Sequence, residues 1–203
     1  MKGVKRIYDG LEARRHIFHI LLGVALIILI KKGILNAWKL FLILSVGFVV
    51  SVLSRRFKIP IVWNMLITFE RPEQLKKGLP GKGAIAYFGG VLLAFKLFPL
   101  EVALASIAIL ALGDPVSHFV GLMFGRIRNP LSLKKMLEGN IAGAIAGGLL
   151  ASIFVSWKYA FPAALAALLI ESVEIKMNDR VVDDNVVIPL AAGATILILR
   201  TLF

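Results

Sequence analysis

The sequence has no cysteine, few charged residues and none of the short motifs typical of well-known soluble nucleotide-binding and hydrolytic enzymes. Without cysteine, the chain has no thiolate nucleophile, no cysteine-ligated metal and no disulfide. Its 203 residues contain no Walker A loop, no glycine-rich loop followed by a Val-Ala-Ile-Lys strand, no Gly-x-Ser-x-Gly elbow and no His-Glu-x-x-His pair. A phosphate-binding or metal-binding site in this chain would therefore have to be built from residues outside these motifs.

Charged residues make up only 18% of the chain, whereas apolar residues make up 59% and the mean hydropathy is +0.86. Soluble domains typically have roughly 45–50% apolar residues, and a chain this small cannot bury such an excess in one aqueous core. The composition excludes a soluble enzyme and a disordered chain, and it predicts an integral membrane protein.

The apolar runs predict an all-α bundle of about seven transmembrane helices, in a single domain that covers residues 1–203. A spanning helix needs about 20 largely apolar residues, or fewer where the bilayer thins locally. The seven runs are Ile17–Ile30, Ala37–Leu53, Gly83–Leu97, Leu100–Phe124, Asn140–Trp157, Ala160–Ile170 and Val186–Phe203. The segment 61–69, IVWNMLITF, is too short to span and is predicted to be re-entrant or interfacial.

The charged residues are distributed unevenly between the two sides of this predicted bundle. With seven spans, most of the 24 Lys and Arg residues fall on the side of the N-terminus. The positive-inside rule then places the N-terminus in the cytoplasm and the C-terminus outside, with the protein in the cell membrane. Nearly all acidic residues share the cytoplasmic side, and only Glu101 falls on the other. This face therefore predicts chemistry on a cytosolic substrate.

The net charge of +12 is interpreted as topology and attraction to anionic membrane lipids, not as nucleic-acid binding. The basic residues border apolar runs and do not form one solvated face. The first apolar run lacks a small-residue cleavage site and further spans follow, so a cleavable signal is not expected.

The strongest local signal is an acidic residue inside apolar sequence, Asp114. A charge at membrane depth costs at least a few kcal/mol, so Asp114 is a functional candidate. Pro115 is expected to kink or restart the helix there. A helix after this point would place Asp114 and His118 on one face. The glycines of this block are Gly113, Gly121 and Gly125. The alternative interpretation is helix packing through the glycines, with Asp114 as an N-cap and a structural histidine.

A second block, at the start of the fifth predicted span, combines Lys134, Lys135, Glu138, Gly139 and Asn140. The N-terminus of a helix binds anions, because its free N–H groups and the positive end of its dipole point the same way. Preceding lysines add to this preference, and the block predicts a phosphate site. Equally, the lysines could be an ordinary positive-inside flank.

A third block is acidic and precedes the last span: it runs from Glu171 to Asp183, Asp184 and Asn185. One such residue suffices to cap a helix. Three adjacent carboxylate and amide groups instead favour Mg²⁺, which takes hard oxygen ligands and shares them with phosphates.

The fourth block, Glu12-Ala-Arg-Arg-His-Ile-Phe-His19, enters the first span. Arg15 and His19 are one helical turn apart and predict part of a polar pocket. An interfacial basic anchor is the alternative.

Taken in order, these blocks resemble the CTP-dependent polyprenol kinases, a family that includes dolichol kinase, phytol kinase and the CTP-using diacylglycerol kinases. The matching segments are Arg15…His19, Gly113-Asp114…Gly121…Gly125, Lys135-Met-Leu-Glu138-Gly139 and Asp183-Asp184-Asn185…Pro189. The resemblance implies a membrane kinase that transfers the γ-phosphate of CTP to a lipid alcohol with Mg²⁺. It departs from the family pattern at Met136, where a serine is common, and at Pro115 and His118.

The resemblance also implies roles for individual residues. The expected catalytic residues are Asp114, Asp184, Lys135 and Glu138. The expected metal ligands are Asp183, Asp184, Asn185 and Asp114. The expected substrate-binding residues are Arg15, His19, His118, Gly113, Gly121, Gly125, Lys134, Gly139 and Asn140. Whether Asp114 takes the hydroxyl proton or binds a second metal stays open at this point.

Two other functions are compatible with the sequence. A phosphatidate cytidylyltransferase would be a related CDP-lipid synthase, although the residue signature of that activity is missing here. A small transporter or lipid-binding protein would explain the intramembrane Asp114 and the glycine faces, but no inverted repeat is found. The glycine faces also serve contacts within or between chains equally well, which leaves a homo-oligomer open.

Overall fold

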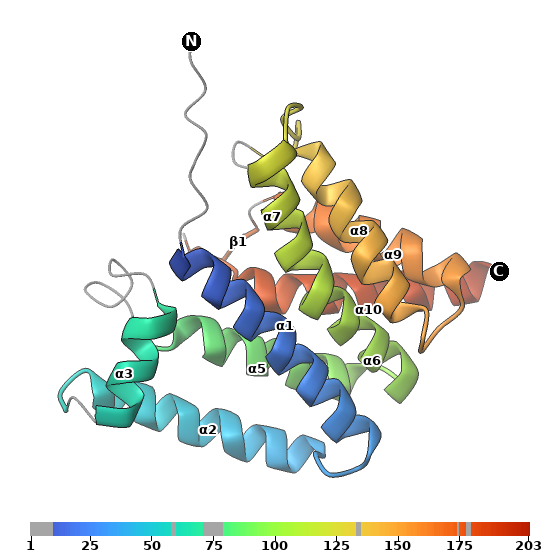
Figure 1. Cartoon of the computed structure of the whole chain (residues 1–203). Helices are drawn as coiled ribbons and strands as arrows, with labels where there is room; N and C mark the ends of the chain where they lie inside the picture. Colours follow the sequence, from blue (N-terminus) through green and yellow to red (C-terminus); the bar gives the residue numbers. More distant parts are fainter. Residues whose placement is uncertain (1–9, 58–59, 71–78, 133–134, 174, 178–179) are drawn as a thin grey trace.

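The computed structural model is an assembly of helices (Figure 1) and describes residues 10–57, 60–70, 79–132, 135–173, 175–177 and 180–203. Its helices are α1 (Gly10–Lys31), α2 (Ala37–Ser54), α3 (Pro60–Phe69), α5 (Lys82–Leu97), α6 (Leu100–Ala108), the π-helical turn η1 (Ile109–Gly113), α7 (Asp114–Phe124), α8 (Leu137–Ala151), α9 (Trp157–Ser172) and α10 (Asp184–Leu202). Within these residues, the strands are the two-residue β1 (Lys176–Met177) and β2 (Arg180–Val181), which pair antiparallel. The predicted helical fold class is confirmed.

Among the residues that the structure describes, four helical segments are long and apolar enough to cross a membrane. They are α1, α2, the continuous run Leu100–Phe124 formed by α6, η1 and α7, and α10. The helices α5, α8 and α9 are shorter, with 16, 15 and 16 residues. The count of seven spans and the orientation of the termini stay predictions.

The predicted helix boundaries differ from the structure most at two places, since α1 begins at Gly10 instead of Ile17 and the fifth predicted span runs past the end of α8 at Ala151. Trp157, predicted as the last residue of the fifth span, is the first residue of α9. The chain turns at residues 152–156, where Ile153, Phe154 and Val155 make the sequence look continuously apolar. Hydropathy alone therefore does not locate this turn. By contrast, the short segment 61–69 lies within the ten-residue helix α3, which rests against α1 through Phe18 and Phe69, whose ring centroids are 4.8 Å apart.

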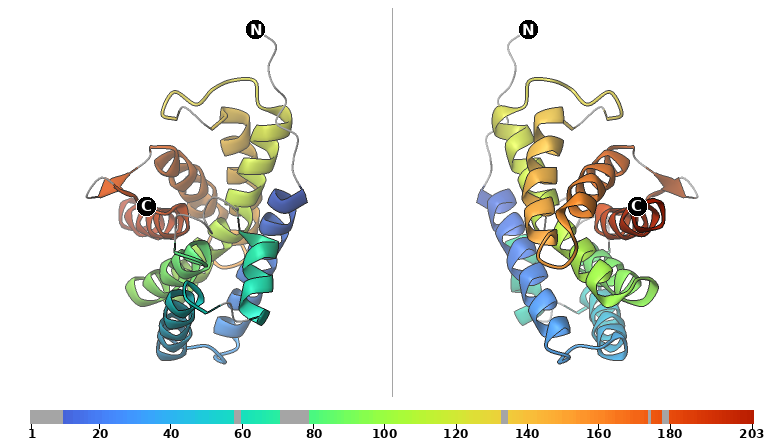
Figure 2. Two further views of the ribbon diagram at one scale, coloured as in Figure 1. Left: turned by 90° about the vertical axis from the view of Figure 1, so that its left-hand side faces the viewer. Right: turned by 90° about the vertical axis from the view of Figure 1, so that its right-hand side faces the viewer.

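The core of the bundle is the middle of the run Leu100–Phe124. Residues 102–111 are buried, and α1, α5, α8, α9 and α10 pack around them. The outward faces of α1, α2 and α8 carry exposed apolar side chains, among them Leu21, Trp38, Phe41, Ile145 and Leu149. An apolar exterior around an apolar interior is typical of helices that face lipid. Figure 2 shows the helices from two sides, with the loop after α7 projecting from one end and the β1–β2 hairpin from one side.

Glycine allows α7 and α8 to approach backbone to backbone. A Cβ added at Gly139 would lie 2.4 Å from the carbonyl oxygen of Ser117, and one added at Gly143 would lie 2.5 Å from that of Gly113. Both distances are too short for real atoms, so the two helices can pack this closely only without side chains. Packing is thus a confirmed role of these glycines.

The π-helical turn η1 ends immediately before Asp114. Pro115 has no backbone N–H and would conflict with the carbonyl one turn earlier in a regular α-helix. A wider turn relieves such a conflict, and single π turns are frequent at functional sites. The helix consequently continues through Pro115 and presents Asp114 and His118 one turn apart on α7.

Candidate functional site

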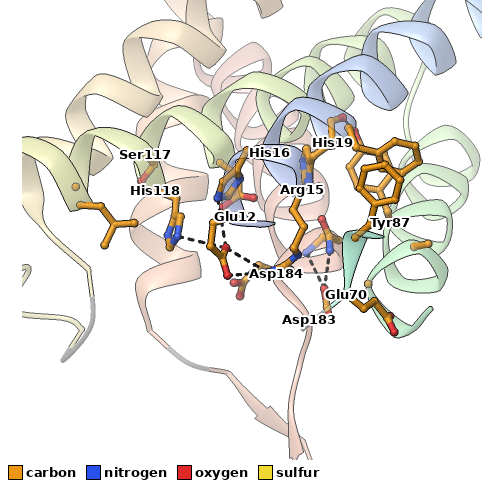
Figure 3. A pocket seen from close by; sticks show the side chains of 18 of the residues that line it. Glu12, Arg15, His16, His19, Glu70, Tyr87, Ser117, His118, Asp183 and Asp184 are labelled. Carbon is orange, nitrogen blue, oxygen red and sulfur yellow. Dashed lines mark hydrogen bonds and ion pairs between the residues drawn. The ribbon is translucent and has the colours of Figure 1, made fainter. Parts of the chain in front are cut away.

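The predicted blocks meet at one large cavity of about 1870 Å³, lined by α1, α3, α5, α7, the start of α10 and the segments next to them. Eleven of the predicted site residues line this cavity, namely Arg15, His19, Asp114, His118, Gly121, Gly125, Lys135, Glu138, Asp183, Asp184 and Asn185. Figure 3 shows polar side chains of α1, α7 and the start of α10 converging there. Gly113, Gly139 and Asn140 do not line the cavity, and Lys134 lies outside the described residues.

One face of α1 at the cavity is polar. Glu12, Arg15, His16 and His19 follow one another at helical spacing, and all four line the cavity. Arg15 donates from Nη1 to both carboxylate oxygens of Glu12 at 3.3 Å. The Nε2 atom of His19 lies 3.1 Å from the carbonyl oxygen of Leu110, and its ring meets Tyr87 edge-on at 4.6 Å. Arg15 and His19 therefore share a pocket as predicted, but they use different partners.

The start of α10 is held by Asp183. Its Oδ1 atom accepts hydrogen bonds from the backbone N–H of Asn185 at 3.3 Å and from Asn185 Nδ2 at 2.8 Å. Asp183 is therefore the N-cap of α10, and its Oδ2 atom lies 3.9 Å from Nζ of Lys82. The capping interpretation applies to Asp183, while Asp184 and Asn185 stand in the first turn of α10 at the cavity wall.

These residues suit a hard cation. Asp114 and Asp184 contribute carboxylates to the same cavity, and Asn185 uses its amide nitrogen toward Asp183, so the atom it can offer a cation is its oxygen. Carboxylate and amide oxygens are the protein ligands that Mg²⁺ takes. The donor set is compatible with the magnesium role expected from the sequence.

Lys135 lies at the cavity but has a strong internal partner. Its Nζ forms an ion pair with Oε1 of Glu171, whose side chain has no exposed surface. Glu171 belongs by sequence to the acidic block before the last helix, and the structure turns it toward α8 instead. A buried carboxylate requires a partner charge, so the pair ties the start of α8 to α9.

Glu138 is bonded to the loop that follows α7. Its Oε1 atom accepts from the backbone N–H groups of Arg126 at 2.9 Å and Ile127 at 3.0 Å. Hydrogen bonds from its own backbone N–H and from these two residues hold the pKa of the Glu138 carboxyl below its usual range. Glu138 thereby fixes the loop that carries Arg126 and Arg128, two cations of the cavity wall.

Asn140 is a buried link between helices. Its Nδ2 atom donates to the carbonyl oxygen of Leu168 at 3.0 Å and to Ser172 Oγ at 2.9 Å. With 1% of its surface exposed, it holds α8 to α9 behind the cavity.

The cavity also contains polar residues to which the sequence analysis assigned no role of their own. They are Glu12, His16, Glu70, Lys82, Tyr87, Ser117, Arg126 and Arg128. Glu12 and His16 could have been found from the helical spacing that connects them to Arg15 and His19. Glu70 accepts a hydrogen bond from the N–H of Gly81 at 2.6 Å, and burial raises the pKa of its carboxyl. Nothing local marks Glu70, because its place in the cavity depends on how α3 packs against α1.

One part of the cavity wall is apolar. It is formed by side chains of α1 and α3, namely Phe18, Leu22, Val62, Met65, Leu66 and Phe69. Elsewhere the cavity lining includes the cations Arg15, Lys82, Arg126, Arg128 and Lys135 together with the carboxylates. We refer to these as the apolar half and the charged half.

Comparison with known proteins gives three informative relatives. The chain is 28% identical over 185 residues to an uncharacterised protein of Methanocaldococcus jannaschii, a match that covers 88% of both chains. It is 30% identical over 133 residues to a probable chloroplastic phytol kinase of Zea mays, covering 60% of this chain and 43% of that protein. It is 31% identical over 75 residues to CTP-dependent diacylglycerol kinase 1 of Eremothecium gossypii, covering 37% of this chain and 24% of that protein.

The chain thus spans less than half the length of the kinases that it matches. No family model and no solved structure matches it. The relatives with named activities are lipid kinases, and these similarities support a relation of the chain to the CTP-dependent polyprenol and lipid kinases.

Proposed function

We propose that this chain is a membrane kinase that transfers the γ-phosphate of a nucleoside triphosphate to the hydroxyl group of a lipid alcohol. The nucleotide that we propose as the phosphate donor is CTP. The observation that carries the proposal is the division of one cavity into an apolar and a charged half. A lipid alcohol has the same division, with an apolar tail and a polar reacting group. The similarity to phytol kinases and to a CTP-dependent diacylglycerol kinase points to the same chemistry.

The apolar half is proposed to hold the first part of the lipid tail. Phe18 and Leu22 of α1 line this part of the cavity together with Met65 and Leu66 of α3. An apolar pocket with a few polar groups at one end is the usual form of a site for such a ligand. The tail would leave toward the bilayer, and the hydroxyl group would lie toward Asp114.

The charged half is proposed to hold the triphosphate. Lys82, Arg126 and Arg128 bring positive charge to the wall, and Lys135 adds more once its pairing with Glu171 is shared with a phosphate. Phosphoryl transfer depends mostly on positioning and on charge neutralisation, which is what such a set of cations provides.

Asp184, with Asn185 or Asp114, would hold Mg²⁺. The chemistry that this ion supplies when bound is neutralisation of negative charge on the transferred phosphate. In the transfer, the lipid oxygen bonds to the γ-phosphorus while the bond from that phosphorus to the β-phosphate oxygen breaks. The hydroxyl proton passes to the Asp114 carboxylate and the nucleoside diphosphate leaves.

A product assay with two labels tests the proposal. Full-length protein in detergent is incubated with Mg²⁺ and with CTP labelled at either the γ- or the α-phosphate, and the acceptors are dolichol, geranylgeraniol, diacylglycerol and phosphatidate. Transfer of the γ-label to an alcohol is the expected result and identifies the substrate. Transfer of the α-label to phosphatidate would replace the kinase by a CDP-lipid synthase.

No transfer of either label to any acceptor, with ATP tested in parallel, would contradict the proposal and favour a transporter or lipid-binding protein. The control variant is Glu101→Gln. Glu101 pairs with Arg200 and does not line the cavity, so its substitution should leave transfer intact.

A further inference from the structure

We propose that Glu12, His16 and His118 form a binding site for a divalent transition-metal cation, with Zn²⁺ as the best-suited ion. The three side chains offer one ligand atom each, and these atoms all lie within 4.8 Å of one another. Oε2 of Glu12 lies 3.9 Å from Nε2 of His16 and 3.9 Å from Nε2 of His118. One carboxylate oxygen therefore lies equally far from both imidazoles, and Figure 3 shows the three side chains next to one another.

Two helices create this geometry. Glu12 and His16 are one turn apart on α1, so their side chains share a face. His118 comes from α7, one turn after Asp114, and its ring centroid lies 4.7 Å from that of His16 at an angle of 43°. The chain has three histidines in all, and two of them meet here across more than 100 residues of sequence.

The donor atoms select the type of metal. Two imidazole nitrogens and one carboxylate oxygen are typical ligands of Zn²⁺ and similar ions, whereas Mg²⁺ prefers oxygen alone. The site therefore differs in chemistry from the oxygen set of Asp184 and Asn185 at the start of α10. Three protein ligands also leave a fourth position for water or a substrate group.

Binding of the ion requires the ligand atoms to move closer together. Zn²⁺ bonds of about 2.0–2.2 Å in tetrahedral geometry place neighbouring ligand atoms about 3.4 Å apart. Each histidine nitrogen would thus approach the Glu12 oxygen by about half an ångström, and atoms 4.8 Å apart would close by about 1.4 Å, movements that side-chain rotation can supply.

The surroundings are suited to hold an ion. The exposed side-chain fractions are 18% for Glu12, 17% for His16 and 35% for His118, so the site is shielded but open to the cavity. Arg15 binds both oxygens of Glu12 and orients the carboxylate, as outer partners of metal ligands commonly do. The positive charge of Arg15 repels a bound cation. The carboxylate of Asp114 offsets this repulsion, because it lies close enough to interact electrostatically with His16.

The test uses the metal alone and does not rest on the proposed kinase activity. Full-length protein is purified in detergent with a tag that contains no histidine, stripped with EDTA and titrated with Co²⁺, whose visible absorption reports nitrogen and oxygen ligands. One ion should bind per chain, Zn²⁺ should displace it, and excess Mg²⁺ should not. Zn²⁺ should also raise the unfolding temperature.

Variants then locate the ion. His16→Ala, His118→Ala and Glu12→Gln should each weaken binding by about tenfold or more, since even outer partners of a metal site commonly account for that much. His19→Gln is the matched control, because His19 lies on the same helix and the same cavity but outside the cluster. It should bind Co²⁺ like the wild type.

Two results would overturn the proposal. One is a wild-type protein that takes up no stoichiometric Co²⁺ or Zn²⁺, a result that needs no variant. The other is a His16→Ala/His118→Ala double variant that is folded by thermal unfolding and still binds one ion per chain. If the kinase assay fails but the protein binds the metal, the metal site stands and the proposed kinase activity falls. If the kinase assay succeeds but no metal binds, only the proposed metal site falls.

Discussion

Two groups of polar residues lie in or next to the cavity, and their side chains are used differently. On the α1, α7 and α10 side, Asp114, His118 and Asp184 are presented to the cavity from helix faces and first turns. On the α8 side, Lys135, Glu138 and Asn140 are bonded to Glu171, to the loop after α7 and to α9. We call these the open side and the tied side.

The difference between the open side and the tied side shows that polar residues near a membrane site can serve either the reaction or the stability of the bundle. All six were predicted from sequence as catalytic or substrate-binding residues. Within a bundle with little water, a polar side chain needs a partner, and the tied residues have theirs in other parts of the protein. The open residues face the space in which a ligand would bind. We therefore expect substitutions on the open side to reduce turnover. Substitutions on the tied side should reduce stability, with an effect on nucleotide binding only at Lys135.

The largest effect is expected from the open side. Asp114→Asn and Asp184→Asn should each lower phosphoryl transfer by about 10²–10⁴-fold, because each removes a charge that the reaction uses while keeping the shape of the side chain. The unfolding temperature in detergent should change little. Turnover within a few fold of wild type in both variants would show that these carboxylates are not part of the reaction.

The largest effect on stability is expected from Lys135. Lys135→Met leaves the Glu171 carboxylate buried without its partner, which should cost about 3–5 kcal/mol of unfolding free energy. The double variant Lys135→Met/Glu171→Leu should recover most of this loss. Equilibrium unfolding of both variants checks the coupling between the two residues.

The same double variant also tests whether Lys135 belongs to the tied side. If Lys135 serves only to tie α8 to α9, the double variant should transfer phosphate at nearly the wild-type rate. A stable double variant with a strongly raised KM for the nucleotide would instead move Lys135 to the open side.

A smaller loss of stability is expected at Asn140. Asn140→Ala removes the donor to Leu168 and Ser172 in a fully buried position, which should cost about 1–3 kcal/mol. The kcat of the folded fraction should stay unchanged, and activity measured against temperature separates the two quantities. A variant with wild-type stability and reduced kcat would contradict the structural role.

The smallest effect is expected at Glu138 and depends on pH. Because the pKa of this carboxyl is lowered on folding, its contribution is present above the ordinary value of 4.5 and is lost as the pH falls through the folded value. The difference in unfolding temperature between the wild type and Glu138→Gln should therefore shrink on acidification. A difference that is constant across this range would show that the charge of Glu138 does not hold the loop.

Much of the fold follows from the sequence, because helices in lipid need long apolar runs. The predicted runs at Ala37–Leu53, Gly83–Leu97 and Leu100–Phe124 agree closely with α2, α5 and the α6–η1–α7 segment. The turn at 152–156 was missed because apolar residues fill it. Hydropathy measures the solvent that a residue prefers, and it does not record where the backbone reverses.

The candidate site was predictable in part. Asp114 and His118 share a helix face, and four blocks of chain lie at one cavity, as the resemblance implied. The partners of the tied side were not predictable, since Lys135 and Glu171 are 36 residues apart and meet only through the packing of α8 and α9. For the same reason, the meeting of Glu12 and His16 with His118 needed the relative placement of α1 and α7.

The most direct test of the central claim, that one cavity holds the lipid and the nucleotide together, is photo-crosslinking with a geranylgeraniol analogue that carries a diazirine on its tail. The account predicts crosslinks at the apolar half, on peptides with Phe18, Met65 or Leu66, and their loss when excess unlabelled alcohol competes. Crosslinks confined to the outer surface of α2, around Trp38 and Phe41, with none in the cavity, would contradict it.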